Sequence, residues 1–393
     1  MKKRNLLILA AAAMLSSGNA LAQATPQWTG TWATAVEFTG PGDMPKSSLS
    51  GRALRQIIHL SIGGEVMRMQ FSNIHSKEPV EIKSVFIATP TDSCDIDVKT
   101  ACYLTFGGKK GVTIAPGEAV YCDVTKYHFT PLQRLSVTIN YGENTPVNAS
   151  SHRGSRTTSY LMQGEVKPKT KFLPTEKCDH WYNMSCIDVQ TDGTVPCVAV
   201  IGNSITDGRG STTNMQNRWT DFMAEAYGGS TAVLNLGIGG NAVVRGGLSE
   251  PAVKRFERDI LQQSGVTSVV IFEGVNDIGG MRPNHAQTVR ELTEAYTQLI
   301  AKAKAAGKKV YLGTITPFLG NGYYTHFSEA ARLTLNDWIR ANKEVDGVLD
   351  FDKVVRDPKE PRQLLKAFSD DGLHGTPAAY EAMGRYAVTI VKS

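Results

Sequence analysis

The chain has 393 residues, a formal net charge of +5 and a hydrophobic content of 41%. At about 100–200 residues per domain this length allows two domains, and the apolar content is ordinary for a globular protein. The small excess of positive charge gives no basis for expecting nucleic acid or an anionic membrane surface as a partner.

The first 22 residues have the organisation of a secretory signal peptide. The basic residues Lys2, Lys3 and Arg4 precede a short apolar run at residues 6–15, and the Ala-Leu-Ala sequence at residues 20–22 is a small-residue cleavage pattern. No stretch approaches the roughly 20 apolar residues that a membrane span needs, and no cysteine at the cleavage site offers a lipid anchor. We therefore expect an exported protein, periplasmic or extracellular, with no membrane anchor and a net charge of +2 after cleavage.

Residues 23–160 read as short strands separated by turn residues. Apolar side chains alternate at residues 58–62 and again at 67–71, and the Gly-Gly pair between these segments predicts a β-hairpin. Further strands are expected at residues 80–88, 120–124 and 135–139. No helical period appears, so the sequence predicts an all-β sandwich of the jelly-roll type.

Six cysteines fit an oxidising compartment. Two pairs of cysteines are close in sequence, and each is expected to form a disulfide that closes a loop. The pairs are Cys94 with Cys102 and Cys178 with Cys186. Cys122 and Cys197 lie in apolar runs and either pair or remain buried thiols. No Cys-x-x-Cys pair occurs, so the spacing does not indicate a zinc site.

Residues 161–194, with a segment rich in Lys, Pro and Thr, are expected to connect the β domain to a second domain at residues 195–393. In that second domain strand and helix patterns alternate. Apolar runs end at Glu273 and Thr316, and residues 289–300 carry apolar side chains at helical spacing between them. Such alternation predicts parallel strands joined by crossover helices, and hence a three-layer α/β/α domain.

One apolar run, at residues 198–201, ends at Gly202, and Ser204 is expected at the start of the helix that follows. Ser204 is then expected at the carboxyl end of a buried parallel strand, where open α/β sheets bind ligands. A serine hydroxyl is a poor nucleophile at neutral pH, so it needs a base and a third group that orients the base. Asp371 and His374 fit these roles, because a carboxylate three residues before an imidazole can hold the ring.

Two more segments follow apolar runs and offer hydrogen-bond donors. Residues 236–241 are rich in glycine, which lets backbone N–H groups approach a reacting atom, and Asn276 ends the next run with a side-chain amide. A nucleotide cradle is disfavoured, because the chain lacks the Gly-Lys-Ser/Thr ending and a regular Gly-x-Gly-x-x-Gly at this turn. Asp207 is expected to cap the helix after Ser204, and Asp277 to bind backbone at its own turn, next to Asn276. Loop residues that could line a cleft are Arg209, Arg245, His152, Tyr323, Tyr324 and His326.

These segments resemble the signature blocks of the SGNH hydrolase family, also called GDSL esterases, over roughly residues 195–390. The resemblance implies an SGNH-type, flavodoxin-like domain with a parallel sheet. It also implies a triad of Ser204, Asp371 and His374, and an oxyanion hole built by Ser204, Gly240 and Asn276.

Two positions depart from the family pattern. Asn203 replaces the aspartate of the usual Gly-Asp-Ser block, and Gly375 stands where a proline commonly follows the histidine. Neither position belongs to the triad.

The β domain ahead of the serine block resembles the arrangement in a secreted subgroup of the same family. The resemblance implies a serine esterase that removes small acyl groups, acetyl being the expected one, from a carbohydrate through an acyl-serine intermediate. No metal and no organic cofactor is expected. The alternatives are a lysophospholipase or lipase with an apolar groove, a catalytically inactive carbohydrate-binding protein, and a β domain used for assembly or surface attachment. Nothing in the sequence indicates an oligomeric state.

Overall fold

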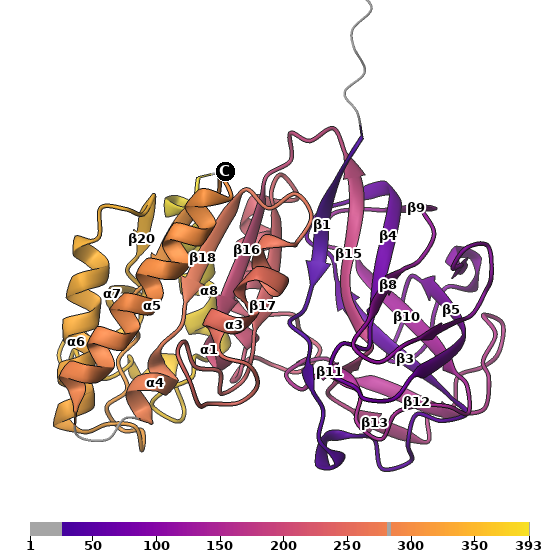
Figure 1. The fold of residues 1–393 in the computed structure, drawn as a ribbon, viewed down its shortest axis with the longest axis horizontal. Helices are drawn as coiled ribbons and strands as arrows, with labels where there is room; N and C mark the ends of the chain where they lie inside the picture. The colour runs from indigo at the N-terminus through magenta and orange to yellow at the C-terminus, as the bar shows by residue number, and fades with distance from the viewer. Residues whose placement is uncertain (1–25, 281–283, 393) are drawn as a thin grey trace, which may run out of the picture.

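The computed structural model describes residues 26–280 and 284–392, so the predicted signal peptide at residues 1–22 lies outside the described residues. An all-β region comes first, and a region with a parallel sheet between helices follows it (Figure 1). None of the helices in the described ranges is long and apolar enough to cross a membrane.

The β region is built from three antiparallel sheets. The largest has the order β13-β12-β3-β10-β5-β6 with β7 beside β5, the second has β1-β15-β4-β8 with β9 beside β4, and the third has β14-β11-β2. The strands are β1 (Gln27–Ala33), β2 (Glu37–Phe38), β3 (Arg52–His59), β4 (Gly64–Ser72), β5 (Val80–Ala88), β6 (Cys102–Leu104), β7 (Val112–Ile114), β8 (Ala119–Tyr121), β9 (Thr125–Phe129), β10 (Arg134–Tyr141), β11 (Ser150–His152), β12 (Ser159–Gln163), β13 (Glu176–Cys178), β14 (Trp181–Tyr182) and β15 (Met184–Thr191). The all-β prediction is thereby confirmed.

The hairpin expected at residues 58–71 does not form. Strand β3 pairs with β10 and β12, whereas β4 pairs with β15, β8 and β9, so the two strands belong to different sheets. The segment between them crosses from one sheet to the other, and on the way Ser61 donates its N–H to the Thr31 carbonyl at 2.9 Å. A Cβ on Gly63 would lie 2.7 Å from the Phe129 carbonyl oxygen. The glycine therefore serves a tight crossing between sheets, not a two-residue turn.

The connector expected at residues 161–194 is wrong as well, because this segment contains β13, β14 and β15. Strand β15 lies inside the second sheet, with Ile187 opposite Met69 of β4 and also opposite Trp32 of β1. The polar composition that suggested a connector belongs only to the loop before β13. The β region therefore continues to Thr191.

The second region has one parallel sheet of order β17-β16-β18-β19-β20. Its strands are β16 (Cys197–Gly202), β17 (Ala232–Gly237), β18 (Ser268–Phe272), β19 (Lys309–Gly313) and β20 (Gly347–Leu349). Its helices are α1 (Ser204–Asp207), α2 (Trp219–Tyr227), α3 (Ala252–Phe256), α4 (Val275–Gly279), α5 (His285–Ala305), α6 (His326–Ala341), α7 (Phe351–Val355) and α8 (Pro377–Ile390). Helix α5 lies in front of the sheet and α8 behind it (Figure 1), which gives the predicted three layers.

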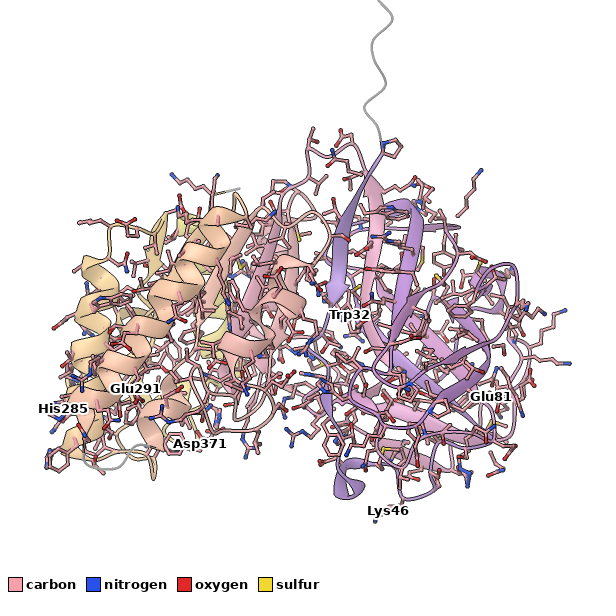
Figure 2. The ribbon with its side chains drawn as sticks, in the orientation of Figure 1. Trp32, Lys46, Glu81, His285, Glu291 and Asp371 are labelled. Atoms are coloured by element: carbon pink, nitrogen blue, oxygen red, sulfur yellow. The ribbon has the colours of Figure 1, made fainter. Side chains whose placement is uncertain are left out.

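The two regions share one hydrophobic core. Strand β1 contacts β17, and a Cβ on Gly30 would lie 2.9 Å from the Leu234 side chain. Trp32 of β1 lies at the boundary between the regions (Figure 2), with its ring edge-on to Trp181 at a centroid distance of 5.2 Å. The β region is therefore packed against the second region rather than tethered to it.

The two local disulfides expected from the sequence do not form, since all six cysteines are free thiols. Cys178 ends β13 in the largest sheet, whereas Cys186 lies in β15 of the second sheet, so their sheets hold them apart. The Sγ of Cys186 lies 3.4 Å from the Tyr121 hydroxyl instead. Cys122 and Cys197 are buried thiols, one of the two alternatives that the sequence left open. Throughout the described part of the chain, no group of His, Cys, Asp and Glu is placed to hold a metal ion.

Candidate active site

Ser204 lies at a sharp turn between β16 and α1. Strand β16 is flanked by β17 and β18 and ends at Gly202, and α1 begins at Ser204. The Asn203 side chain caps this helix by accepting a hydrogen bond from the Ile205 N–H at 3.0 Å. A Cβ on Gly202 would lie 2.2 Å from Thr206 Oγ1, so only glycine permits the turn. Ser204 therefore stands at the carboxyl end of a central strand, as predicted.

The structure brings Ser204 together with Asp371 and His374. The Oγ of Ser204 lies 2.8 Å from His374 Nε2, and His374 Nδ1 lies 2.7 Å from Asp371 Oδ2. The other carboxylate oxygen of Asp371 accepts the N–H groups of Leu373 at 3.0 Å and His374 at 2.8 Å. One carboxylate thus holds both the imidazole ring and the loop that carries it.

Burial and nearby charges set the protonation states of this pair. Burial alone raises the pKa of Asp371, but hydrogen bonds from His374 and Leu373 outweigh it and bring the pKa to about 2. Burial lowers the pKa of His374 from its usual 6.5, Asp371 opposes that shift, and the positive charges of Arg209 and Arg156 add to it. At neutral pH Asp371 is ionised and His374 is neutral, which is the state that a general base requires.

Hydrogen-bond donors line the same cleft as the serine, from Ser204, Gly240 and Asn276. Within residues 26–280 and 284–392, the backbone N–H groups of Ser204 and Gly240 donate to no protein acceptor. Gly240 has a φ of +73°, and a Cβ there would lie 2.9 Å from Leu248. The Asn276 amide donates one N–H to the Asn241 carbonyl at 2.7 Å, and its second N–H has no acceptor among the residues that the structure describes. Three donors can therefore converge on one oxyanion.

Neighbouring side chains orient these donors. The Tyr323 hydroxyl donates to Asn276 Oδ1 at 3.0 Å, which fixes which end of the amide carries the N–H groups. The Asp277 carboxylate accepts the N–H groups of Val243 and Val244 at 2.8 and 3.1 Å, and so holds α4 to the end of the glycine-rich loop. Asp277 does bind backbone, as predicted, but it does so in this distant loop and not at its own turn, where the sequence had placed the contact. The sequence placed Tyr323 only in a cleft loop, because nothing local marks it as the partner of Asn276.

Asn203, which departs from the family pattern, has a specific partner. Its Nδ2 donates to Oε2 of Glu273 at 3.1 Å. Glu273 is fully buried, and burial raises the pKa of its carboxyl to about 8 even though Arg255 lies 3.7 Å away. An amide offers this carboxyl a donor, whereas an aspartate would place a second acid beside a buried one. The amide of Asn203 is therefore better suited than a carboxylate to contact the buried carboxyl of Glu273.

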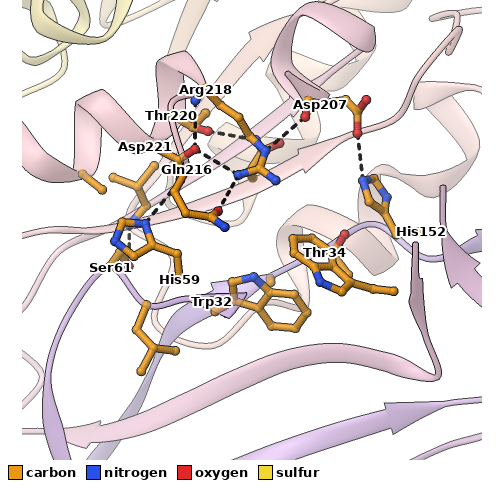
Figure 3. Close-up of a pocket in the computed structure, with 16 residues that line it drawn as sticks. Trp32, Thr34, His59, Ser61, His152, Asp207, Gln216, Arg218, Thr220 and Asp221 are labelled. Atoms are coloured by element: carbon orange, nitrogen blue, oxygen red, sulfur yellow. Dashed lines mark hydrogen bonds and ion pairs between the residues drawn. The ribbon is translucent and has the colours of Figure 1, made fainter. Parts of the chain in front are cut away.

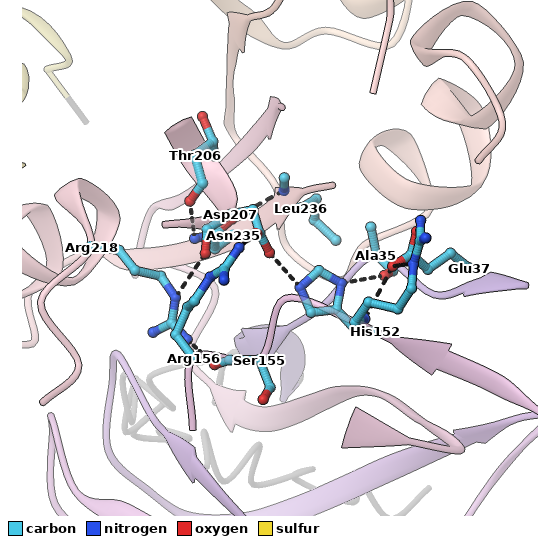
Figure 4. Close-up of polar contacts among 12 residues, drawn as sticks. Ala35, Glu37, His152, Ser155, Arg156, Thr206, Asp207, Arg218, Asn235 and Leu236 are labelled. Atoms are coloured by element: carbon cyan, nitrogen blue, oxygen red, sulfur yellow. Dashed lines mark hydrogen bonds and ion pairs between the residues drawn. The ribbon is translucent and has the colours of Figure 1, made fainter. Parts of the chain in front are cut away.

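Side chains of the β region contact Asp207 at the end of α1, the helix that begins at Ser204 (Figure 4). Asp207, the last residue of α1, is fully buried, and its two oxygens accept hydrogen bonds from His152 Nε2 at 2.8 Å and from Arg156 Nη2. The Nδ1 of His152 lies 2.9 Å from the Ala35 carbonyl. A Cβ on Gly154 would collide with the Asp207 carboxylate. The capping role expected for Asp207 is therefore wrong, because α1 is capped by the residue before Ser204 and Asp207 instead ties the two regions together.

Behind this contact lies a small cavity of about 40 Å³ between the regions (Figure 3). Its walls include His152 and Trp181 from the β region and Asp207 and Arg218 from the second region. Arg218 spans the boundary by donating to the Asp207 carbonyl at 3.2 Å and to the Ser155 carbonyl. A space of this size holds at most a few waters. The cavity is therefore a small gap in the packed boundary between the two regions and not a substrate site.

The cleft above Ser204 is open and has a volume of about 530 Å³. Both regions line it, and the β region contributes Glu37, Arg153, Gly154 and Arg156. Glu37 also accepts a hydrogen bond from Ser249, in the loop that follows Gly240. The β region therefore forms one wall of the cleft.

Among the loop residues predicted to line a cleft, the structure places Arg209 and Tyr323 in this one. His152 is buried beneath it, and Arg245 lies in a neighbouring hollow, where it pairs with Glu291 at 2.7 Å. Tyr324 and His326 are not part of the lining.

Comparison with known proteins follows the same division of the chain. The model of the GDSL-like lipase/acylhydrolase family matches residues 200–382, a span that contains Ser204, Asp371 and His374. No curated protein sequence matches the chain.

Several solved structures are similar to about half of the chain. One belongs to a lipolytic protein of the G-D-S-L family from Desulfitobacterium hafniense, with 21% identity, 50% of this chain and 99% of that chain covered, and a TM-score of 0.40. A GDSL-like lipase from Bacteroides thetaiotaomicron has 19% identity, coverages of 49% and 86%, and a TM-score of 0.37. The carbohydrate acetylesterase Est24 from Sinorhizobium meliloti has 15% identity, coverages of 49% and 97%, and a TM-score of 0.39. The family match alone identifies residues 200–382 as a GDSL-like lipase/acylhydrolase domain.

Proposed function

We propose that this protein is an exported serine esterase that removes small acyl groups, acetyl in particular, from a carbohydrate. One observation carries the proposal. His374 lies 2.7 Å from Asp371 and 2.8 Å from Ser204, and all three residues line a cleft that also presents N–H donors with no partner among the described residues. This is the arrangement that nucleophilic acyl transfer by a serine requires.

In the proposed reaction His374 Nε2 takes the hydroxyl proton of Ser204 while Oγ attacks the ester carbonyl. The N–H groups of Ser204, Gly240 and Asn276 stabilise the oxyanion, and one such donor lowers the barrier by about 3–4 kcal/mol. His374 then protonates the departing sugar oxygen, which leaves an acyl group on Ser204. Water, activated by the same imidazole, releases the carboxylic acid, and Asp371 stabilises the imidazolium in both steps.

The lining of the cleft supports a short acyl group. Among the described residues that line it, only Leu248 and Leu373 are aliphatic, and the others are polar, charged or glycine apart from Tyr323. A long acyl chain is bound by a continuous apolar groove, because each buried CH₂ contributes about 0.8 kcal/mol. The lysophospholipase or lipase alternative therefore fits this cleft less well than an acetyl ester of a polar, hydrated molecule such as a sugar.

Export is proposed from the leader-like residues 1–22, and the carbohydrate class from the resemblance to exported relatives with a β domain. The β region forms a wall of the cleft, which supports a role in shaping the substrate site over a role in attachment. An inactive carbohydrate-binding protein would not need the aligned Ser204 and His374.

The test compares the full-length mature protein with Ser204→Ala on nitrophenyl esters from acetyl to decanoyl, and then on acetylated polysaccharides with released acetate as the readout. We expect turnover that is fastest for acetyl, falls with chain length and disappears in the variant. A preference for long chains would favour a lipase, and no Ser204-dependent turnover of any ester would leave the binding protein as the better account.

A further inference from the structure

Three guanidinium groups line the cleft beside Ser204, namely those of Arg153, Arg156 and Arg209. Arg153 and Arg156 come from the β region, and Arg209 follows α1 in the second region. So many arginines around a proposed site for neutral esters require an explanation.

Two of the three charges are already paired. Arg153 makes two hydrogen bonds to the Glu37 carboxylate, from Nε at 3.0 Å and from Nη2 at 2.7 Å. Arg156 donates through Nη2 to the buried Asp207 carboxylate. These pairs hold the β region against the serine turn, so their charges are not available to a ligand.

Arg209 is different. Its backbone is fixed, because its N–H donates to the Ser204 carbonyl at 2.9 Å and its carbonyl accepts the Tyr380 hydroxyl. Its side chain is exposed, and within the described residues its guanidinium makes no hydrogen bond and no ion pair. Arg209 therefore carries an unpaired positive charge on a backbone that two hydrogen bonds hold in place, five residues after Ser204.

The acids nearby do not neutralise this charge. Asp371 lines the same cleft, but both of its oxygens are occupied by His374 and Leu373. Asp370 lines the adjoining hollow together with Arg209 and forms no ion pair with it. The charge of Arg209 is nevertheless felt at the reaction centre, since it helps to lower the pKa of His374.

We propose that Arg209 binds a carboxylate of the substrate next to the scissile ester, so that the substrate is an acylated sugar acid or a glycan containing one. This inference rests on the proposed esterase function and names the class of its substrate. The planar fork of a guanidinium matches a carboxylate with two parallel hydrogen bonds, and such charged hydrogen bonds are the strong ones. Arg209 would then decide specificity, while the contacts at Ser204 carry the chemistry.

The test uses a pair of substrates that differ only in charge: a mono-O-acetylated methyl glucuronoside and its neutral carboxamide. We expect the wild-type protein to prefer the acid, and the ratio of the two kcat/KM values to fall about 10- to 100-fold in Arg209→Gln. Arg385→Gln is the matched control, because Arg385 is an exposed arginine on α8 outside the cleft. It should keep the wild-type ratio.

A binding measurement keeps this test independent of turnover. The acid and the carboxamide are titrated into Ser204→Ala protein with and without Arg209→Gln, and calorimetry records the affinities. Preference for the acid that disappears with Arg209 supports the inference even if the esterase proposal fails. Equal affinities for acid and carboxamide, a preference that survives Arg209→Gln, or tighter binding of a sugar sulfate or phosphate than of the acid would overturn it. The nitrophenyl acetate assay with Ser204→Ala shows separately whether the esterase proposal stands.

Discussion

The buried contact between His152 and Asp207 should couple the β region energetically to the serine turn. The His152 side chain is 4% exposed and the Asp207 side chain is 0% exposed. The ring lies between two acceptors, with Nδ1 2.9 Å from the Ala35 carbonyl and Nε2 2.8 Å from the Asp207 carboxylate. The contact is therefore a buried hydrogen bond to a carboxylate that also forms an ion pair with Arg156.

The size of the effect follows from this burial. Removing one partner of a buried hydrogen bond to a charged group costs about 1.5–3 kcal/mol of folding free energy, because the remaining polar group loses that bond away from water. We expect His152→Ala to destabilise the protein by that amount and Asp207→Ala by at least as much. In the double variant neither side chain of the His152–Asp207 contact remains without the other, so the loss of stability should fall short of the sum of the two single losses by up to about 3 kcal/mol. Because Asp207 ends the helix that begins at Ser204, both single variants should also lower kcat.

Urea unfolding followed by tryptophan fluorescence measures these free energies, since Trp181 stacks on His152 at a centroid distance of 5.8 Å. The exposed pair of Arg385 and Glu381 on α8 is the control, and its coupling should stay below about 1 kcal/mol. Losses for His152→Ala and Asp207→Ala that simply add, within about 0.5 kcal/mol, would refute the claim that the β region holds the serine turn.

The remaining predictions concern the donors, the base and the cysteines. Asn276→Ala should lower kcat by about 100- to 1000-fold, and Tyr323→Phe, which removes only the bond that orients the amide, by about tenfold or less; equal losses in the two variants would contradict the orienting role of Tyr323. The pKa of His374 is lowered, so the unprotonated base persists to lower pH, and the acid limb of kcat/KM should have its midpoint below 6.5; a midpoint above that value would count against His374 as the neutral base. Unfolding without reductant should expose six reactive thiols, counted with a thiol reagent, whereas a smaller count would reveal a disulfide.

The residues of the candidate site could be predicted because each one belongs to a short local pattern, either after a strand or within one loop. Ser204 follows β16 directly, Asn276 follows β18, and the Asp371–His374 pair sits on one loop. In a parallel sheet the carboxyl ends of neighbouring strands meet at one edge, so patterns that are distant in sequence converge.

What could not be predicted depends on pairing between distant segments. Alternation at β3 and β4 specifies two strands, but their partners β10 and β15 lie far along the chain, so the hairpin was the wrong choice. Asp207 looked like a helix cap because His152 and Arg156, its real partners, belong to the other region. The prediction of a disulfide between Cys178 and Cys186 was wrong for the same reason, because two residues that are close in sequence need not lie in one sheet.

The central claim is that Ser204 carries the acyl group between two half-reactions. The most direct measurement mixes the wild-type protein with 4-nitrophenyl acetate, quenches with acid during turnover, and maps acetylated peptides by mass spectrometry. We predict one acetyl group on the peptide that contains Ser204, and none there in Ser204→Ala. Rapid release of nitrophenol with no acetyl on Ser204, or with the acetyl group on another residue, would contradict the account.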